Sequence, residues 1–65
     1  MLKVKIWGRY QDKQGRVWKA IEDLKFGRWL LRREDRCVIA ELKRADMERF
    51  GYVYLGQGAS EYVAA

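Results

Sequence analysis

Lysine and arginine gather in the first half of the chain, with an aromatic residue among them. Lys3 and Lys5 alternate with apolar residues, and Trp7 and Arg9 continue the same alternation. Cations neutralise the phosphates of a nucleic acid, and a flat ring stacks on a base or wedges between base pairs. The residues predicted to form such a surface are Lys3, Lys5, Trp7, Arg9, Lys19, Arg28 and Arg32.

The same residues also fit a plain solvated face. Lysine stems cover apolar surface while their ammonium groups stay in water. Trp7 would then pack on Val17 or Ile21 instead of contacting a ligand. Both interpretations of the basic face stay open at the level of the sequence.

Charge is distributed unevenly along the chain. The net charge is +5, but residues 1–33 hold ten Lys/Arg against three Asp/Glu, and residues 34–65 hold four against six. A basic half joined to a mildly acidic half indicates one surface for an anionic partner. Ordinary solubility requirements also produce a net charge of this size.

Several kinds of catalytic and metal chemistry lack their residues. The chain has no His, and its single Cys and single Ser are Cys37 and Ser60. A Cys/His zinc site and a Ser-His-Asp triad therefore cannot be assembled within one chain. We expect no enzymatic activity, no metal and no cofactor.

The composition also predicts a cellular setting. A single cysteine excludes an internal disulfide and suits a reducing compartment, so we expect a cytoplasmic protein. No apolar run reaches the roughly 18 residues of a membrane helix, and the N-terminal stretch lacks the apolar region of a signal peptide. Cys37 lies within an apolar segment and is expected to be buried as a small hydrophobe.

The first third of the chain predicts a β-hairpin. Residues 2–10 alternate between apolar and charged, which is typical of a half-buried strand. Asp12 and Gly15 then suit a type I turn followed by a left-handed glycine, a three-residue hairpin loop. In this register Tyr10 faces Trp18. The predicted core face carries Leu2, Val4, Ile6, Gly8, Tyr10, Trp18, Ala20 and Leu24.

Residues 17–26 fit two structures. Apolar residues at positions 17, 21 and 24 also suit a short amphipathic helix. No Ser, Thr, Asp or Asn stands just before this segment to cap a helix. We therefore expect a strand to Ile21 and a turn over residues 22–26.

The segment Gly27–Leu42 predicts a second hairpin, because two apolar runs flank a charged stretch. With Glu34 and Asp35 at the tip, Leu30 faces Ile39 and Arg28 faces Glu41 in a favourable charge pair. The predicted inner face carries Trp29, Leu31, Val38, Ala40 and Leu42.

The last third predicts one helix and one strand. Residues 43–50 favour a helix of one to two turns, and Gly51 stands where a left-handed C-cap is expected. Tyr52–Leu55 then reads as a short strand, in which Tyr52 and Tyr54 would pack or stack. Residues 61–65 could form a final edge strand, and residues 62–65 in particular are expected to form a flexible or subunit-contacting tail of a single domain spanning residues 1–65.

These elements predict a mainly β fold (small α+β), built as a strongly bent sheet or a five-stranded barrel. The element order, size and basicity resemble the SH3-like barrels of small basic chromatin proteins of archaea. The resemblance implies an SH3-like barrel and carries no binding residue over to this chain. In size, about 60% of the unfolded surface is the most that such a domain buries.

Two functions follow as hypotheses. The first is a non-enzymatic nucleic-acid-binding module with little sequence specificity, for which we expect duplex DNA or RNA as partner, bound through the cationic face around Trp7. The second is a protein–protein interaction domain, such as a small phage- or plasmid-type modulator or a homo-oligomer subunit, docking through an exposed strand edge. Neither hypothesis involves a membrane or a small-molecule substrate.

Overall fold

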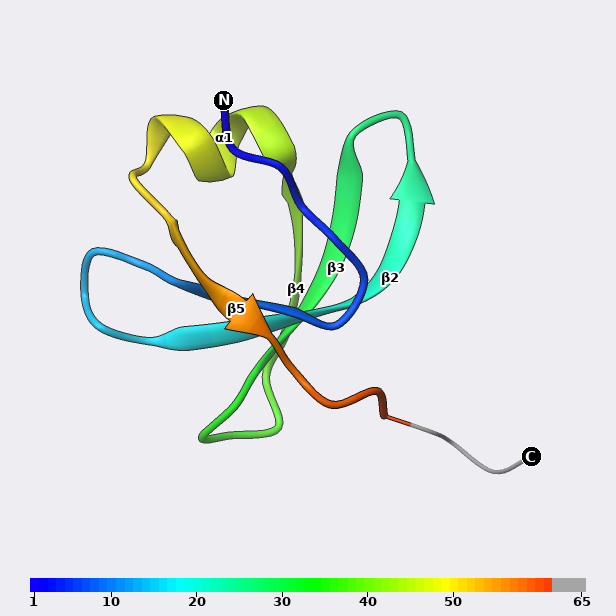
Figure 1. Cartoon of the computed structure of the whole chain (residues 1–65), viewed down its shortest axis with the longest axis vertical. Coiled ribbons are helices and arrows are strands. Elements are labelled where there is room, and N and C mark those ends of the chain that lie inside the picture. Colours follow the sequence, from blue (N-terminus) through cyan, green and yellow to red (C-terminus); the bar gives the residue numbers. More distant parts are fainter. Residues whose placement is uncertain (62–65) are drawn as a thin grey trace.

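The computed structural model describes residues 1–61, which form one antiparallel sheet with a short helix at one end (Figure 1). The elements are β1 (Gly8–Gln11), β2 (Val17–Lys25), β3 (Arg28–Arg33), β4 (Ile39–Lys43), α1 (Arg44–Arg49) and β5 (Val53–Gln57). The strand order is β4-β3-β2-β1-β5. The predicted mainly β domain with one short helix is confirmed.

The sheet is open at both ends. β4 and β5 are its outermost strands, and within residues 1–61 they do not pair with each other. The SH3-like barrel is therefore not confirmed. The predicted tail over residues 62–65 lies outside the described residues.

The first hairpin follows the prediction. Tyr10 faces Trp18 in the β1–β2 ladder, and the Asp12 amide donates to the Arg16 carbonyl at 2.9 Å. The Gly15 amide donates to the Asp12 carbonyl at 3.1 Å, and Gly15 has φ +85°. These are the features of a type I turn followed by a left-handed glycine.

The turn predicted over residues 22–26 is wrong. β2 continues as a strand through Lys25, and the chain reverses at Phe26 and Gly27, which have φ values of 58° and 74°. Positive φ at both loop residues is the mark of a type I′ hairpin turn. Lys25, which precedes the loop next to a register shift, also has a positive φ of 72°. Pairing with β3 shifts register between Ala20 and Glu22 and again before Lys25, and such bulges bend a strand. Figure 1 shows β2 turning upward along this part.

The second hairpin forms in a different register from the predicted one. Leu30 faces Glu41 instead of Ile39, because the loop holds four residues and the Arg33 amide donates to the Val38 carbonyl at 2.8 Å. A shift of two residues leaves each strand residue on its predicted face. Val38, next to the loop, is an exception: its side chain is 41% exposed, although it was predicted to lie in the core.

The predicted strand over residues 2–10 is wrong in its first half. β1 begins at Gly8, because Trp7 has φ 65° and the Gly8 amide donates to the Lys5 carbonyl at 3.0 Å in a tight turn. Residues 1–6 leave the sheet and cross its inner side toward α1 (Figure 1). Alternation of apolar and charged residues does not distinguish a strand of the sheet from a segment that crosses it. Leu2 and Val4 still pack against the core, whereas Ile6 is 40% exposed.

The Tyr10 side chain holds the crossing segment in place. Its hydroxyl accepts from the Lys5 amide at 2.8 Å and donates to the Lys3 carbonyl at 3.0 Å. Burial of the ring raises the pKa of Tyr10, so the hydroxyl stays protonated as the donor that Lys3 requires. Gly8 leaves room for this ring, because a Cβ there would lie 2.8 Å from the Tyr10 hydroxyl oxygen.

The helix ends as predicted. The Tyr52 amide donates to the Met47 carbonyl at 3.0 Å, and the Gly51 amide donates to the Glu48 carbonyl at 3.1 Å. Gly51 has φ +77°, so these bonds form a Schellman C-cap. Met47 is fully buried and closes one end of the core.

The core is small and lies on one side of the sheet, which we call the inner face. Its buried members are Tyr10, Trp18, Ala20, Leu31 and Met47. Trp29, Ala40 and Leu42 pack against them as the sequence predicts. Cys37 is exposed in the β3–β4 loop, so its predicted burial is wrong.

Candidate nucleic-acid interface

Three of the predicted site residues form a row across the outer face of the sheet. Arg9 on β1 faces Lys19 on β2, and Lys19 faces Arg32 on β3. Strands lie about 4.8 Å apart, so the row spans roughly 10 Å. We call Arg9, Lys19 and Arg32 the outer row.

Carboxylates of the same chain neutralise much of the outer row. Arg9 donates Nε to Glu34 Oε2 at 2.7 Å and Nη2 to Glu34 Oε1 at 2.9 Å. This two-point hydrogen bond raises the pKa of Arg9 and lowers the pKa of Glu34. Lys19 Nζ lies 3.6 Å from Glu61 Oε2, and Arg32 pairs with the same oxygen. Three cations of the outer row therefore meet two carboxylates.

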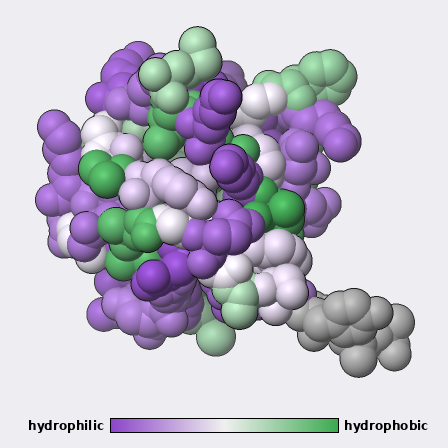
Figure 2. Space-filling view, in the orientation of Figure 1, coloured by the Kyte–Doolittle hydropathy of each residue, from purple (hydrophilic) through white to green (hydrophobic). Residues whose placement is uncertain are grey.

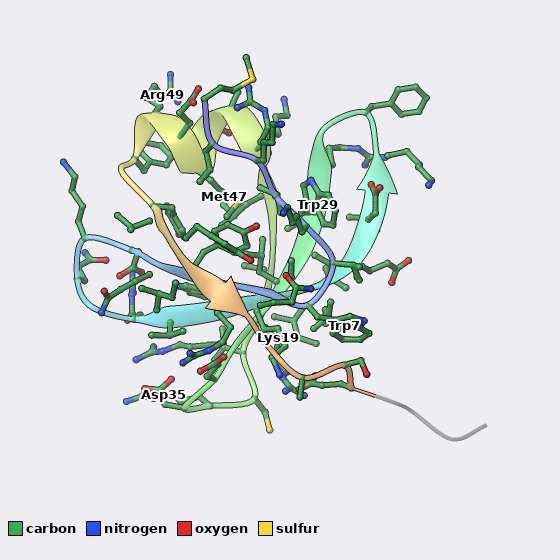
Figure 3. The ribbon with its side chains drawn as sticks, viewed as in Figure 1. Trp7, Lys19, Trp29, Asp35, Met47 and Arg49 are labelled. Carbon is green, nitrogen blue, oxygen red and sulfur yellow. The ribbon has the colours of Figure 1, made fainter. Side chains whose placement is uncertain are left out.

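The chain beyond β5 lies against this row. The Gly58 amide donates to the Trp7 carbonyl at 2.7 Å. A Cβ on Gly58 would lie 2.9 Å from the Trp7 carbonyl oxygen, so glycine permits this close approach of the two backbones. Figure 3 shows Trp7 and Lys19 near each other where the chain leaves β5. Trp7 is half-buried, and its backbone anchors the C-terminal segment.

The other predicted residues lie elsewhere. Lys3 and Lys5 are exposed on the crossing segment, on the inner side of the sheet and away from the outer row. Arg28 is the first residue of β3 and stands four residues before Arg32, about 13 Å along the strand. It pairs with Glu41 at 3.4 Å, as predicted, although the two residues now lie diagonally across the strands. The residues of the predicted surface thus lie in three separate places, namely the outer row with Trp7 beside it, the crossing segment, and the start of β3.

Lys3 and Lys5 lie beside an aromatic ring that the sequence assigned mainly to packing. Tyr54 on β5 has its ring centroid 5.3 Å from that of Tyr10, yet the residue is 41% exposed. Lys5 Nζ stands 6.0 Å from the centroid of the Tyr54 ring, within the range of a cation–π contact. A hollow of about 300 Å³ is lined by Met1, Leu2, Lys3, Lys5 and Tyr54.

A second hollow continues this surface along β5. Its volume is about 310 Å³, and it is lined by Asp12, Lys13, Gln14, Arg16, Phe50 and Tyr52. Tyr52 stands two residues before Tyr54, and Phe50 is 52% exposed. We call Lys3, Lys5, Lys13, Phe50, Tyr52 and Tyr54 the β5 surface.

The lysines of the β5 surface differ electrostatically from the outer row. Among residues 1–61, Lys3, Lys5 and Lys13 take part in no ion pair, whereas every member of the outer row does. Figure 2 shows hydrophilic and hydrophobic residues interleaved on the face that carries β5. Unpaired cations between exposed rings are the combination that nucleic-acid-binding surfaces use.

Sequence reasoning missed Lys13 and Phe50 as parts of a surface. Lys13 lies in the first hairpin loop and Phe50 at the end of α1, and folding brings both to the second hollow. A Cβ on Gly51 would lie 2.3 Å from Lys13 Cε, which shows how closely the lysine stem follows the helix end. No periodic signal in the sequence links these positions, because their contact depends on the β1–β5 pairing.

Other kinds of site find little support. Within the described part of the chain, no group of His, Cys, Asp or Glu is arranged to hold a metal ion. No helix among residues 1–61 is long and apolar enough to cross a membrane. No protein-family model, curated protein or solved structure matches this chain. The outer row and the β5 surface are therefore the two candidate sites that the described residues offer.

Proposed function

We propose that this chain is a small non-enzymatic nucleic-acid-binding module with little sequence specificity. The β5 surface is the proposed contact, in place of the single basic face around Trp7. The observation that supports it is the position of Lys3, Lys5 and Lys13, which form no ion pair within residues 1–61, beside the exposed rings of Tyr54 and Phe50.

Electrostatics favours the β5 surface over the outer row as the first contact. A phosphate that approaches Arg32 must compete with the carboxylate of Glu61, which already pairs with it. A phosphate that approaches Lys3 or Lys13 displaces only water and mobile ions, and release of counterions from the nucleic acid drives binding. We therefore do not propose the outer row as the first contact of the nucleic-acid backbone.

The exposed rings favour unpaired bases over a closed duplex. One side of the Tyr54 ring packs on Tyr10, and the rest borders the hollow next to Lys3 and Lys5. Stacking of a base on such a ring contributes about 1–3 kcal/mol and requires that the base be accessible. Single-stranded nucleic acid is therefore the favoured form, and duplex binding is one outcome of the test.

Low sequence specificity follows from the chemistry of the proposed contacts. Lysine acts as a point charge toward phosphate oxygens, and an aromatic ring stacks on any base. Neither group reads the hydrogen-bonding edge of a base as a two-point donor does. Affinity should therefore vary little between oligonucleotides of equal length and different sequence.

The test compares two variants with the same net charge. One carries Lys3→Gln, Lys5→Gln and Lys13→Gln, and the control carries Lys25→Gln, Arg36→Gln and Lys43→Gln. Fluorescence anisotropy with a labelled single strand and a labelled duplex should show that the first variant loses about tenfold or more in affinity. The control should stay within about threefold of the unmodified chain. Equal losses in both variants, or no binding by the unmodified chain at low salt, would contradict the proposal.

A second candidate function is docking of an acidic extended segment of a protein partner along β5. Within residues 1–61 β5 pairs only with β1, and Val53 and Leu55 are 58% and 42% exposed. An unpaired strand edge offers free backbone groups to a further strand. Two copies of this chain would bring their lysines together at this edge, so the charges favour an acidic partner over a homo-oligomer. Light scattering that shows a concentration-dependent dimer would contradict this choice of partner.

A further inference from the structure

One carboxylate on the outer face serves two cations from neighbouring strands. Glu61 Oε2 lies 3.6 Å from Lys19 Nζ and pairs with Arg32. Lys19 Nζ also donates to the Ala59 carbonyl at 3.0 Å. The side chain of Lys19 is only 12% exposed, so its ammonium group is held largely by the C-terminal segment.

The carboxylate sits over a strongly basic position. Arg9 faces Lys19 in the ladder, and Lys19 faces Arg32, so three cationic side chains stand in line. Glu34 forms its two-point hydrogen bond with Arg9, and its charge also interacts with those of Lys19 and Arg32. Lys19 and Arg32 together carry two positive charges against the single negative charge of Glu61.

We propose that the outer row is a binding site for a phosphate group, which Glu61 of the same chain occupies as an internal competitor. The inference is independent of the β5 surface. A phosphate monoester carries about −1.5 to −2 charge and three oxygens, more than one carboxylate offers. It therefore matches Lys19 and Arg32 in charge and can reach Arg9 with its third oxygen.

The C-terminal segment is attached in a way that permits exchange. Its position over the row depends on the Gly58–Trp7 hydrogen bond of 2.7 Å and on the polar contacts of Lys19 and Arg32. Ala59 and Ser60 are exposed. Release of Glu61 therefore costs polar contacts that a phosphate replaces.

The experiment titrates inorganic phosphate into the isotopically labelled chain at low ionic strength, with sodium chloride at matched ionic strength as the reference. Nuclear magnetic resonance follows the side-chain signals of Lys19 and Arg32 and the backbone amides of residues 58–61. We expect saturable shifts in phosphate and none of that size in chloride. Shifts that are equal in the two salts would overturn the proposal.

Variants then test the internal competition. Glu61→Gln should tighten phosphate binding about three- to tenfold, because it removes a partly exposed ion pair without removing volume. Arg32→Gln should weaken it by a similar factor. Glu41→Gln, which breaks the ion pair of Arg28 on the same strand, is the matched control and should leave it unchanged. Circular dichroism checks that each variant is folded, and an unchanged affinity in Glu61→Gln would contradict the competition.

A second arm separates the two sources of phosphate. A single-stranded oligonucleotide that ends in a 5′-phosphate monoester replaces inorganic phosphate in the same titration of Glu61→Gln, and the same oligonucleotide with a 5′-hydroxyl is the reference, because each internal phosphodiester carries only one charge. Tighter binding of the 5′-phosphorylated strand than of its reference identifies the end of a nucleic acid as the source. Equal binding of the two strands, with tighter binding of inorganic phosphate, identifies a small phosphorylated molecule, and the site then stands even where the proposed nucleic-acid function fails.

Discussion

Asp12 is the one buried charged residue of the described chain, and its replacement should be costly. The residue is 7% exposed. Oδ1 accepts from the backbone amides of Gln14 and Arg16, each at 2.9 Å. Oδ2 accepts from Arg16 Nε at 2.6 Å and from Trp18 Nε1 at 3.2 Å. One carboxylate thus joins the hairpin loop to the core tryptophan.

The substitution Asp12→Asn isolates the second oxygen. Asparagine retains one carbonyl oxygen for the loop amides, but its NH₂ group faces the Trp18 indole N–H and the Arg16 guanidinium. A buried donor left without an acceptor costs about 1–3 kcal/mol. We therefore expect a loss of about 2–3 kcal/mol in the free energy of unfolding. A domain of this length has roughly 3–10 kcal/mol in total.

The loss should depend on pH in a definite direction. Burial alone would raise the pKa of Asp12, but hydrogen bonds from Trp18, Arg16 and Gln14 outweigh it and lower the pKa below its usual value. A pKa that is lower in the folded chain stabilises the fold above the unfolded value of about 3.9, and this stabilisation is lost as the pH falls through the folded value. The difference between the two chains should therefore be largest near pH 7.

Urea unfolding followed by circular dichroism at pH 7 and pH 3 measures this difference. Asp46→Asn is the matched control, since Asp46 pairs with Arg49 at 3.3 Å on the surface of α1. It should cost less than about 1 kcal/mol at either pH. A loss from Asp12→Asn that is the same at both pH values would refute the electrostatic part of this reasoning, and a loss below about 0.5 kcal/mol would refute the part based on burial.

Two further predictions concern the core and the β3–β4 loop. Leu31→Ala removes a fully buried side chain from the central sheet and should lower the free energy of unfolding in urea by about 2–5 kcal/mol. Ile39→Ala, at a position 56% exposed, should lower it by less than about 1 kcal/mol. Equal losses would contradict the assignment of the core. Cys37 is exposed, so one equivalent of a thiol reagent should react with the native chain at nearly the rate seen in denaturant. Reaction only after unfolding would restore the buried position that the sequence predicted.

The turn and the register of the first hairpin could be predicted, because its turn residues fix the loop length, although the lengths of its two strands could not. Asp12 and Gly15 belong to a turn type that admits one loop length, and Tyr10 then has to face Trp18. The second hairpin has no glycine between its strands, and its charged stretch fits either a tip of two residues or a loop of four, Glu34–Cys37. The structure has the longer loop, which shifts the register by two residues. The face of the sheet on which each strand residue lies was therefore predicted, but its partner on the neighbouring strand was not.

The N-terminal segment shows what alternation cannot decide. Leu2 and Val4 bury their side chains against the core from a crossing segment, where the sequence pattern suggests a strand. The deciding features are side-chain contacts with the backbone of this segment. The Tyr10 hydroxyl holds it from a few residues away, and Glu48, far along the chain, accepts from the Leu2 amide at 2.6 Å. The same contact lowers the pKa of Glu48.

The sequence predicts that the candidate site is basic, but it does not predict which of its cations lie together or which of them form ion pairs. The sequence shows that the first half of the chain is basic, and Arg9, Lys19 and Arg32 do share a face. Whether a cation is free depends on carboxylates far along the chain, such as Glu34 beside Arg9 and Glu61 beside Lys19. No local pattern in the sequence reveals these partners, whereas Lys3, Lys5 and Lys13 have none among residues 1–61.

The most direct test of nucleic-acid binding through the β5 surface is the salt dependence of affinity for a single-stranded oligonucleotide. Three lysines that contact phosphates predict a slope of about −2 in a plot of log affinity against log salt concentration. The slope should fall by most of this amount in the variant with Lys3→Gln, Lys5→Gln and Lys13→Gln, and should stay the same in the control with Lys25→Gln, Arg36→Gln and Lys43→Gln. A slope near zero in the unmodified chain, or one that the two variants reduce equally, would contradict the assignment.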